Sequence, residues 1–338
     1  MKKYLIDPNL KWYKANLHCH TNNSDGYFAP DEIKKLYMEQ GYSVVAFSDH
    51  ETIFDNSYLT DDNFVALTAT EYSINDFSKG MYFRNMKVIH MNLISKDPHN
   101  LFHPAANQAT FSEKQKKMFF ERYGMEVPCD NYERKYTQES IQETINRANA
   151  MGFLVQFNHP NWSLNTREDY MNLKGLWSLE IFNYLTEIET GAEYCVNLYD
   201  DMLREGHRLF CSMGDDNHNL EGSIEGSFGG FDYIGASSLT YENIFNALKE
   251  GNFYGSMGPI IKSLSYDKDE KKVYVECSEA VDIICVCYNR YFMHYAGENL
   301  TSAVFVLADD EKYFRIAVKD KYGRYANTHA YFLDEISK

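Results

Sequence analysis

The chain has 338 residues, of which 44% are hydrophobic and 24% charged, as is typical of globular proteins. Its net charge of -16 repels polyanions and argues against a broad nucleic-acid surface, although a small phosphorylated ligand is not excluded. The first residues lack the apolar segment of a signal peptide, and no apolar run is long enough to span a membrane. Seven cysteines without a framework spacing predict reduced thiols, so we expect a cytoplasmic protein with no membrane contact.

Short apolar runs alternate with helical patterns from residue 14 to about 255. Helices are predicted over 30–40, 138–151 and 242–252, each with a glycine at or just after its end. This alternation predicts an α/β fold with a parallel sheet, open or closed into a barrel, whose active site lies at the carboxyl ends of the strands. The predicted strands cover 44–48, 64–69, 87–94, 153–158, 179–183, 208–214 and 233–239.

Two later segments depart from this pattern. Residues 98–137 contain aromatic and charged residues and one short helical stretch but no clear strand, which indicates an inserted lid or a packed surface excursion. After the YGSMGP segment at 254–259, short strands with polar turns predict a small β-sandwich, in which Cys285 and Cys287 lie on one face of a buried strand. The predicted domains are therefore residues 1–257 and residues 258–338.

A group of histidines and carboxylates predicts a metal site. In a strand, His18 and His20 would project to the same side, either as a metal pincer or as two histidines on a polar face. Further candidates on or after the later strands favour the metal site, and their number exceeds the ligands of one structural zinc. Imidazole and carboxylate ligands suit Zn, Fe or Mn, so we expect two or three divalent ions. These further candidates are Asp49, His50, Glu71, His90, His159, Asp215, Asp216 and His218.

The segments HCHTNNSDG, APDEI, GYSVVAFSDH, TEYS, IH, NHP and DDNH resemble, in this order, the PHP (polymerase and histidinol phosphatase) superfamily. The junction and the β module are similar to those of bacterial stand-alone PHP phosphoesterases and their relatives of the carbaryl-hydrolase type. The resemblance implies a distorted α/β barrel of about seven strands and a metal centre of up to three ions, with Glu71 as a bridging ligand. The implied metal ligands are His18, His20, Asp25, His50, Glu71, His90, His159, Asp216 and His218.

Four further residues receive expected roles near this centre. Asp49 could orient a ligand or cap a turn. Asp215 stands where similar proteins often have serine, and its extra carboxylate could shift the metal preference. Asn161 and Arg167 are expected to contact the substrate, Arg167 as a fork for a phosphate unless it lies on a solvated helix face. Trp162 is interpreted as a packing residue.

The expected activity is that of a metal-dependent hydrolase acting on a small phosphate ester. A hydroxide bridging two metals would attack phosphorus, with Glu71 and His218 as catalytic residues. One alternative is a hydrolase of carbamates, esters or amides on the same metals, and a cation near the cluster would favour phosphate instead. A second alternative is a non-catalytic ligand-binding protein on this scaffold. The expected partner is a small phosphorylated molecule, and the sequence leaves the oligomeric state open.

Overall fold

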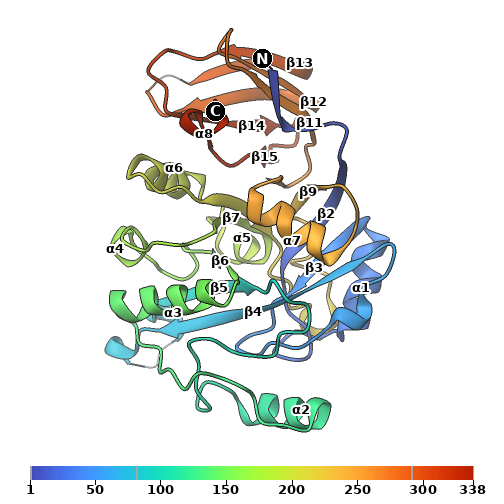
Figure 1. Cartoon of the computed structure of the whole chain (residues 1–338), viewed down its shortest axis with the longest axis vertical. Helices are drawn as coiled ribbons and strands as arrows, with labels where there is room; N and C mark the ends of the chain where they lie inside the picture. Colours follow the sequence, from blue (N-terminus) through green and yellow to red (C-terminus); the bar gives the residue numbers. More distant parts are fainter. Residues whose placement is uncertain (1, 81–82, 291, 338) are drawn as a thin grey trace.

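The structure is a computed structural model that describes residues 2–80, 83–290 and 292–337 (Figure 1). The strands before residue 260 are β1 (Lys2–Ile6), β2 (Lys11–Cys19), β3 (Tyr42–Phe47), β4 (Val65–Asn75), β5 (Val88–Ile94), β6 (Leu154–Phe157), β7 (Ser178–Asn183), β8 (Phe210–Gly214), β9 (Phe231–Ala236) and β10 (Phe253–Ser256). The later strands are β11 (Ile261–Asp267), β12 (Lys272–Cys287), β13 (Met293–Val306), β14 (Tyr313–Lys319), β15 (Tyr325–Asn327) and β16 (Tyr331–Phe332).

The α-helices are α1 (Pro30–Glu39), α2 (Glu113–Tyr123), α3 (Gln138–Ala150), α4 (Arg167–Tyr170), α5 (Tyr184–Thr190), α6 (Val196–Arg204), α7 (Tyr241–Glu250) and α8 (Leu333–Ile336). Short 3-10 helices are η1 (Ser57–Leu59), η2 (Phe77–Lys79), η3 (Phe83–Asn85) and η4 (Leu220–Gly222). The predicted strands before 240 and the three predicted helices all occur, with ends shifted by a few residues. Within the described residues, no helix combines the length and the apolar composition that crossing a bilayer requires.

Most of the strands follow one hydrogen-bonded path in the order β1-β11-β12-β14-β15-β10-β9-β2-β3-β4-β5-β6-β7-β8, and off this path β13 pairs with β12 and β16 with β14. Neighbours β2, β3 and β4 are parallel, and so are β6, β7 and β8. The prediction of a parallel sheet is wrong for β5, which is antiparallel to both β4 and β6, and for β9, which is antiparallel to β2. Among its described residues, the connection from β4 to β5 contains 3-10 turns and no α-helix, and a connection without a crossover helix returns the chain in the opposite direction.

The two ends of the β2–β8 series approach each other. The loop after β8 hydrogen-bonds to β2, because the amide of Asp216 donates to the carbonyl of His18 at 3.0 Å and the amide of His20 donates to the carbonyl of Asn217 at 3.2 Å. Among the described residues, the Cys19–Asn217 bridge is the one strand-type pairing between these segments. The fold is thus mixed α/β with one large sheet, and a fully closed barrel stays a prediction.

Helices cover the sheet through apolar faces that the sequence periodicity encodes. Ile33 and Tyr37 of α1 pack against Val45 and Phe47 of β3. Helices α3 and α6 join a core with β5 to β8, and α7 joins one with β2 to β4. Because this covering leaves the polar ends of the strands at one edge, the histidines and carboxylates meet there.

The segment 98–137 forms no strand and contains α2, as predicted, and it lies at the opposite end of the molecule from β11–β14 (Figure 1). It has a small core of its own, made of Phe54, Ala106, Phe111, Phe119 and Val127. This segment is therefore packed against the loop after β3.

The chain from β11 onward consists of strands and the short α8. Cys285 and Cys287 are buried on one face of β12, as predicted. β12 is one long strand from Lys272 to Cys287, and the last strand, β16, ends at Phe332 because α8 begins at Leu333. The N-terminal β1 pairs with β11, across the predicted domain division at 257, and that division and the sandwich stay predictions.

Candidate metal centre

Strands β2 to β8 bring all nine predicted ligands to one place. His18 lies in β2 and His20 directly after it, Glu71 and His90 lie within β4 and β5, and the others lie in loops that follow strand ends. Glu71 occupies the middle of β4, where the strand exchanges its parallel partner β3 for its antiparallel partner β5. The longer β4 thus places Glu71 between the two halves of the strand series.

Glu71 is the hub of the cluster. Its two carboxylate oxygens lie 3.1–3.4 Å from nitrogens of five imidazoles, and its side chain is buried. Asn158 also donates its side-chain amide to Oε1 of Glu71 at 2.8 Å. A carboxylate with both oxygens shared among several imidazoles has the arrangement of a bridging ligand. The five histidines are His18, His20, His50, His90 and His159.

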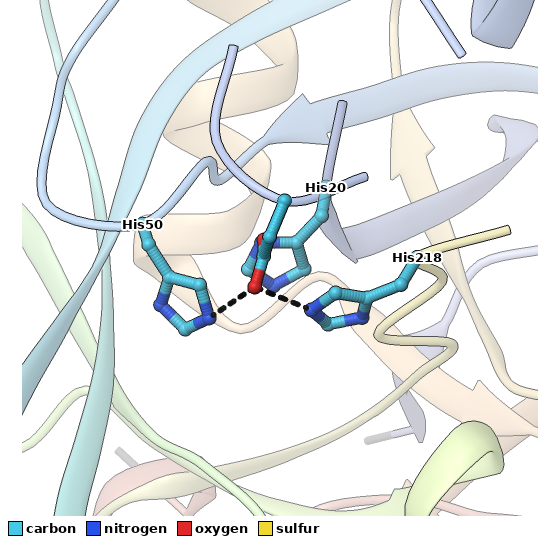
Figure 2. Close-up of side chains that lie close together, drawn as sticks. His20, His50 and His218 are labelled. Atoms are coloured by element: carbon cyan, nitrogen blue, oxygen red, sulfur yellow. Dashed lines mark ion pairs between the residues drawn. The ribbon is translucent and has the colours of Figure 1, made fainter. Parts of the chain in front are cut away.

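A second carboxylate group faces outward. Asp25 Oδ2 lies 3.6 Å from Nε2 of His50 and 3.4 Å from Nε2 of His218. Figure 2 shows His20, His50 and His218 converging on this position from three different segments. Gly26, which follows Asp25, is required here because a Cβ would lie 2.7 Å from the backbone of His20. The SDG turn is therefore built to bring a carboxylate to the exposed side of the cluster.

Four overlapping sets of side chains could each hold an ion, with their ligand atoms within 4.8 Å of one another. His18, His20, Glu71 and His159 each belong to two sets, so neighbouring ions would share ligands. The sets are His20, Asp25, His50 and His218; His18, His20, Glu71 and Asp216; His18, His159 and Glu180; and Glu71, His90 and His159.

Orphaned polar atoms test whether divalent ions fit. Buried His20 Nδ1, His50 Nδ1 and Asp216 Oδ1 have no hydrogen-bond partner, although a carboxylate oxygen or an imidazole nitrogen lies within 4 Å of each. His18 and His20 also direct their Nε2 atoms at each other at 3.3 Å. Buried polar atoms without hydrogen bonds are costly, and facing imidazole nitrogens need a proton or a cation between them. The donor set therefore fits divalent ions such as Zn, Mn or Fe.

The pKa values show that the carboxylates create a negative electrostatic potential at the candidate centre. Burial opposes the charge on His20, but Asp216 and Glu71 outweigh it and raise its pKa to about 10. The pKa of His159 rises to about 9, because contacts led by the hydrogen bond to Glu71 outweigh burial. His50 differs, since burial and the neighbouring histidines lower its pKa to about 3. The inner carboxylates thus attract positive charge into a site from which water is excluded.

The structure places the two predicted supporting carboxylates differently. Asp49 accepts hydrogen bonds from the amide of Thr21 at 2.8 Å and the hydroxyl of Ser24 at 2.8 Å, and Ser24 also contacts Asp25. Asp49 therefore fixes the loop that carries Asp25. Asp215 accepts three backbone amides of residues 228–230 and the hydroxyl of Tyr37, so it holds that loop and is absent from the four sets.

Glu180 is a functional candidate that the sequence reasoning missed. It lies in β7 with its side chain buried, and its Oε1 lies 3.1 Å from Nδ1 of His18. It also accepts the amide of His159 at 3.2 Å and the side-chain amide of Asn183 at 3.0 Å. A proton on Nδ1 of His18 would bond to Glu180 and leave Nε2 to face Glu71. The available signal was a charged residue inside the apolar strand sequence LEIFN.

The cluster forms one wall of a cavity of about 990 Å³. Arg84, in η3, lines this cavity and is, among its described lining residues, the one cationic side chain apart from histidines. Arg167 does not line the cavity, because it is half exposed and paired with Asp201 at 2.9 Å and with Glu205. Asn161 also turns away and donates to the carbonyl of Ala192.

Two further placements concern the cavity. The segment 98–137 was expected to be a lid or a packed surface excursion, and none of its residues, all of which the structure describes, lines the cavity. Trp162, interpreted as a packing residue, lines the cavity with its ring centroid 5.2 Å from that of His159.

No family model and no curated protein sequence matches this chain. Among solved structures, one similar chain is from Bacteroides vulgatus, described as a two-domain protein containing a predicted PHP-like metal-dependent phosphoesterase. It is 12% identical, covers 96% of both chains and has a TM-score of 0.44. A candidate metal-dependent phosphoesterase from Bifidobacterium adolescentis is 18% identical over 60% of this chain and 87% of that one, with a TM-score of 0.38.

A third similar structure is an amidohydrolase from Chromobacterium violaceum with bound sulfate and no metal. It is 13% identical over 62% of this chain and 89% of its own, with a TM-score of 0.41.

Proposed function

We propose that this protein is a metal-dependent hydrolase of small phosphate esters. The observation that carries the proposal is the hub at Glu71, where five imidazoles from four chain segments meet at one wall of a large cavity. Two or three divalent ions, held by the nine predicted ligands, would supply charge neutralisation at the ester and activation of water at neutral pH. The ligands are His18, His20, Asp25, His50, Glu71, His90, His159, Asp216 and His218.

The candidate ligands form two groups, one buried in the protein and one partly exposed to the cavity. His18, His20 and Glu71 are buried, so they hold charge where water does not screen it. Asp25, His50 and His218 line the cavity and are partly exposed, so they meet the substrate. Nδ1 of His218 lies 2.8 Å from the carbonyl of Asp216, to which it donates. This leaves Nε2 to bind an ion or, in the protonated ring, to donate a proton to the leaving alkoxide.

Arg84 supports phosphate over a carbon-centred ester. Hydrolysis of a carbamate or amide places less negative charge at the substrate, and a guanidinium suits the doubly charged phosphate. Arg84 lines the same cavity as the cluster, whereas Arg167 is already paired with two carboxylates at the surface. The anchoring role expected of Arg167 is therefore proposed for Arg84.

Metal content and phosphate release, measured on the same preparation, test the proposal. We expect two or three equivalents of Zn, Mn or Fe by mass spectrometry, with phosphate release from an ester panel that chelation abolishes and metal restores. Glu71→Gln should lose both metal and activity, whereas Glu143→Gln, on the outer surface of α3, should keep both.

Different failures separate the alternatives. Bound metal with no phosphate release from any ester, but with cleavage of carbamates or amides, would establish the carbon-centred hydrolase. A protein that keeps its metal and turns over neither class would be a binding protein on this scaffold.

A further inference from the structure

Part of the cavity wall beside the candidate metal ligands is apolar. We define an apolar collar as five side chains from three segments of the chain that line the cavity together with the cluster. It includes part of α5 and the loops that follow β6 and β8, so it surrounds the candidate centre on the side of the carboxyl ends of these strands. Its members are Trp162, Leu164, Leu185, Ile188 and Leu220.

The collar keeps large apolar side chains in contact with solvent. Leu164 is 45% exposed, Ile188 43% and Leu220 67%. Single exposed apolar residues are common, but three that line one concave space beside a polar cluster indicate a ligand surface. Leu164 also has a φ of 58°, a left-handed conformation that a leucine disfavours, and such backbone conformations concentrate at binding sites.

Trp162 connects the collar to the metal ligands. Its ring lies 5.2 Å from that of His159 and 5.9 Å from that of His90, measured between ring centroids. Its Nε1 donates to Oε2 of Glu189 at 2.8 Å, which fixes the indole plane at the cavity wall. An apolar group that stacks here would place an attached ester next to the metal ligands.

The charges around the collar restrict the rest of the substrate. Glu189 and Glu225 line the cavity, and the chain as a whole carries a net charge of -16. Arg84, identified above among the described lining residues, is the cationic side chain that balances part of this negative charge. One phosphate can be neutralised at the centre, but further anionic groups, such as those of nucleoside diphosphates, would meet carboxylates.

We propose that the apolar collar binds the organic group of the substrate, so that the substrate is a monophosphate ester of an alcohol carrying an aromatic or branched aliphatic group. That the substrate is a phosphate ester rests on the proposed function, whereas the nature of its organic group rests on the cavity alone. A volume of about 990 Å³ accommodates such a molecule beside the ions.

Two esters with the same kind of leaving group test the proposal. Both 3-phenylpropyl phosphate and glycerol 3-phosphate release a primary alkoxide, so a difference in rate reports contacts with the organic group. For the metal-loaded protein, we expect kcat/KM for the phenylpropyl ester to be at least about 10-fold higher, mainly through KM. An equal or higher kcat/KM for glycerol 3-phosphate would overturn the proposal.

A pair of matched variants locates the effect. Ile188→Ser should raise KM for the phenylpropyl ester about 10-fold and leave that for glycerol 3-phosphate unchanged. Ile224→Ser is the control, because Ile224 is 57% exposed near the cavity but does not line it. Equal effects of the two variants, or equal effects of Ile188→Ser on both esters, would contradict the collar.

Binding of phosphonates separates this proposal from the proposed function. A phosphonate has a P–C bond in place of the ester oxygen, so 4-phenylbutylphosphonate can bind without being hydrolysed. We expect it to bind the metal-loaded protein at least about 10-fold more tightly than ethylphosphonate and to change a tryptophan emission that Trp162→Phe removes. Tight phosphonate binding without hydrolysis of either ester would uphold the collar and refute the phosphoesterase. Equal affinities for the two phosphonates would refute the collar itself.

Discussion

At the scale of single residues, the candidate centre contains buried carboxylates, and burying a carboxylate without polar partners would destabilise the protein. Glu71, Asp216 and Glu180 are all buried. Glu71 and Glu180 each lie 3.1 Å from an imidazole nitrogen, and Oδ2 of Asp216 accepts the side-chain amide of Asn183 at 3.1 Å. Unpaired buried charges cost several kcal/mol, roughly 3–5 for a broken pair. The cluster is therefore stable only as a set, and removal of one member should affect the others.

Glu180→Gln tests this dependence at one residue. The variant keeps the shape of the side chain but removes the charge that orients His18, so we expect metal affinity to fall by roughly 10- to 100-fold. Competition with a chelator measures the affinity, and far-ultraviolet circular dichroism checks the fold. Glu143→Gln on the surface of α3 provides the control. Unchanged metal affinity would show that Glu180 only supports packing.

At the scale of elements, the insertion 98–137 stabilises the loop that carries His50. Gln115 of α2 donates its side-chain amide to the carbonyl of His50, and Arg134 pairs with Glu51. His103 is fully buried and accepts the amide of Ile53 at 2.6 Å. These contacts fix the loop after β3 from the side that faces away from the cavity. The insertion can therefore influence the position of His50 without lining the cavity.

The pH dependence of stability reports this docking. Burial lowers the pKa of His103 to about 3, whereas an unfolded histidine titrates near 6.5. As the pH falls, the unfolded chain binds the proton first, so this contribution is present above about pH 6.5 and about 2 kcal/mol is lost by pH 5. Urea unfolding at pH 7 and pH 5 should show a smaller loss for His103→Gln than for the natural chain. Identical losses in both proteins would exclude His103 as the source.

At the scale of the whole molecule, a buried ion pair joins the C-terminal strands to the helices. Arg315 of β14 is buried and donates to both carboxylate oxygens of Asp200 in α6, at 2.7 and 2.8 Å. Tyr199 adds a bond from the amide of Ala330 to its hydroxyl at 3.0 Å. The geometry favours one fixed orientation of the two parts, because a bidentate pair tolerates little rotation.

Substitution of Arg315 in this ion pair should destabilise the protein as a whole. Arg315→Met leaves Asp200 as an uncompensated buried charge, so we expect a loss of roughly 3–5 kcal/mol in the free energy of unfolding. Arg208→Met breaks a pair with Asp334 that also joins the two parts but is exposed, and it should cost less than about 1 kcal/mol. Denaturant unfolding compares the two, and equal losses would remove the special role of Arg315.

Much of this organisation was predictable because it follows from local periodicity. His18 and His20 share a strand face, and the later ligands sit at strand ends or on strands that apolar runs define. The direction of β5 was not predictable from its own sequence, because it depends on the path of the connection before it. Glu180 was missed for a similar reason, since a lone carboxylate in a strand acquires its role only from His18, far away in the sequence.

The residues that line the cavity were the least predictable. Arg167 looked suitable because it follows a strand end, but the short α4 directs it toward Asp201 and Glu205. Arg84 lies in the connection between β4 and β5, whose turns carry no periodic signal that would place it at the cavity. Loop geometry, which sequence periodicity does not encode, decides which cation reaches the centre.

The pairing of β1 with β11 has a consequence for synthesis of the chain. β1 leaves the ribosome before β11, and the residues that pair with it, 264–267, follow only after every segment with a candidate metal ligand has been made. Until then β1 presents an unpaired strand edge, which is a template for pairing with other chains. A ribosome that stalls before β11 would therefore release a chain with its ligands complete but its first strand open to aggregation.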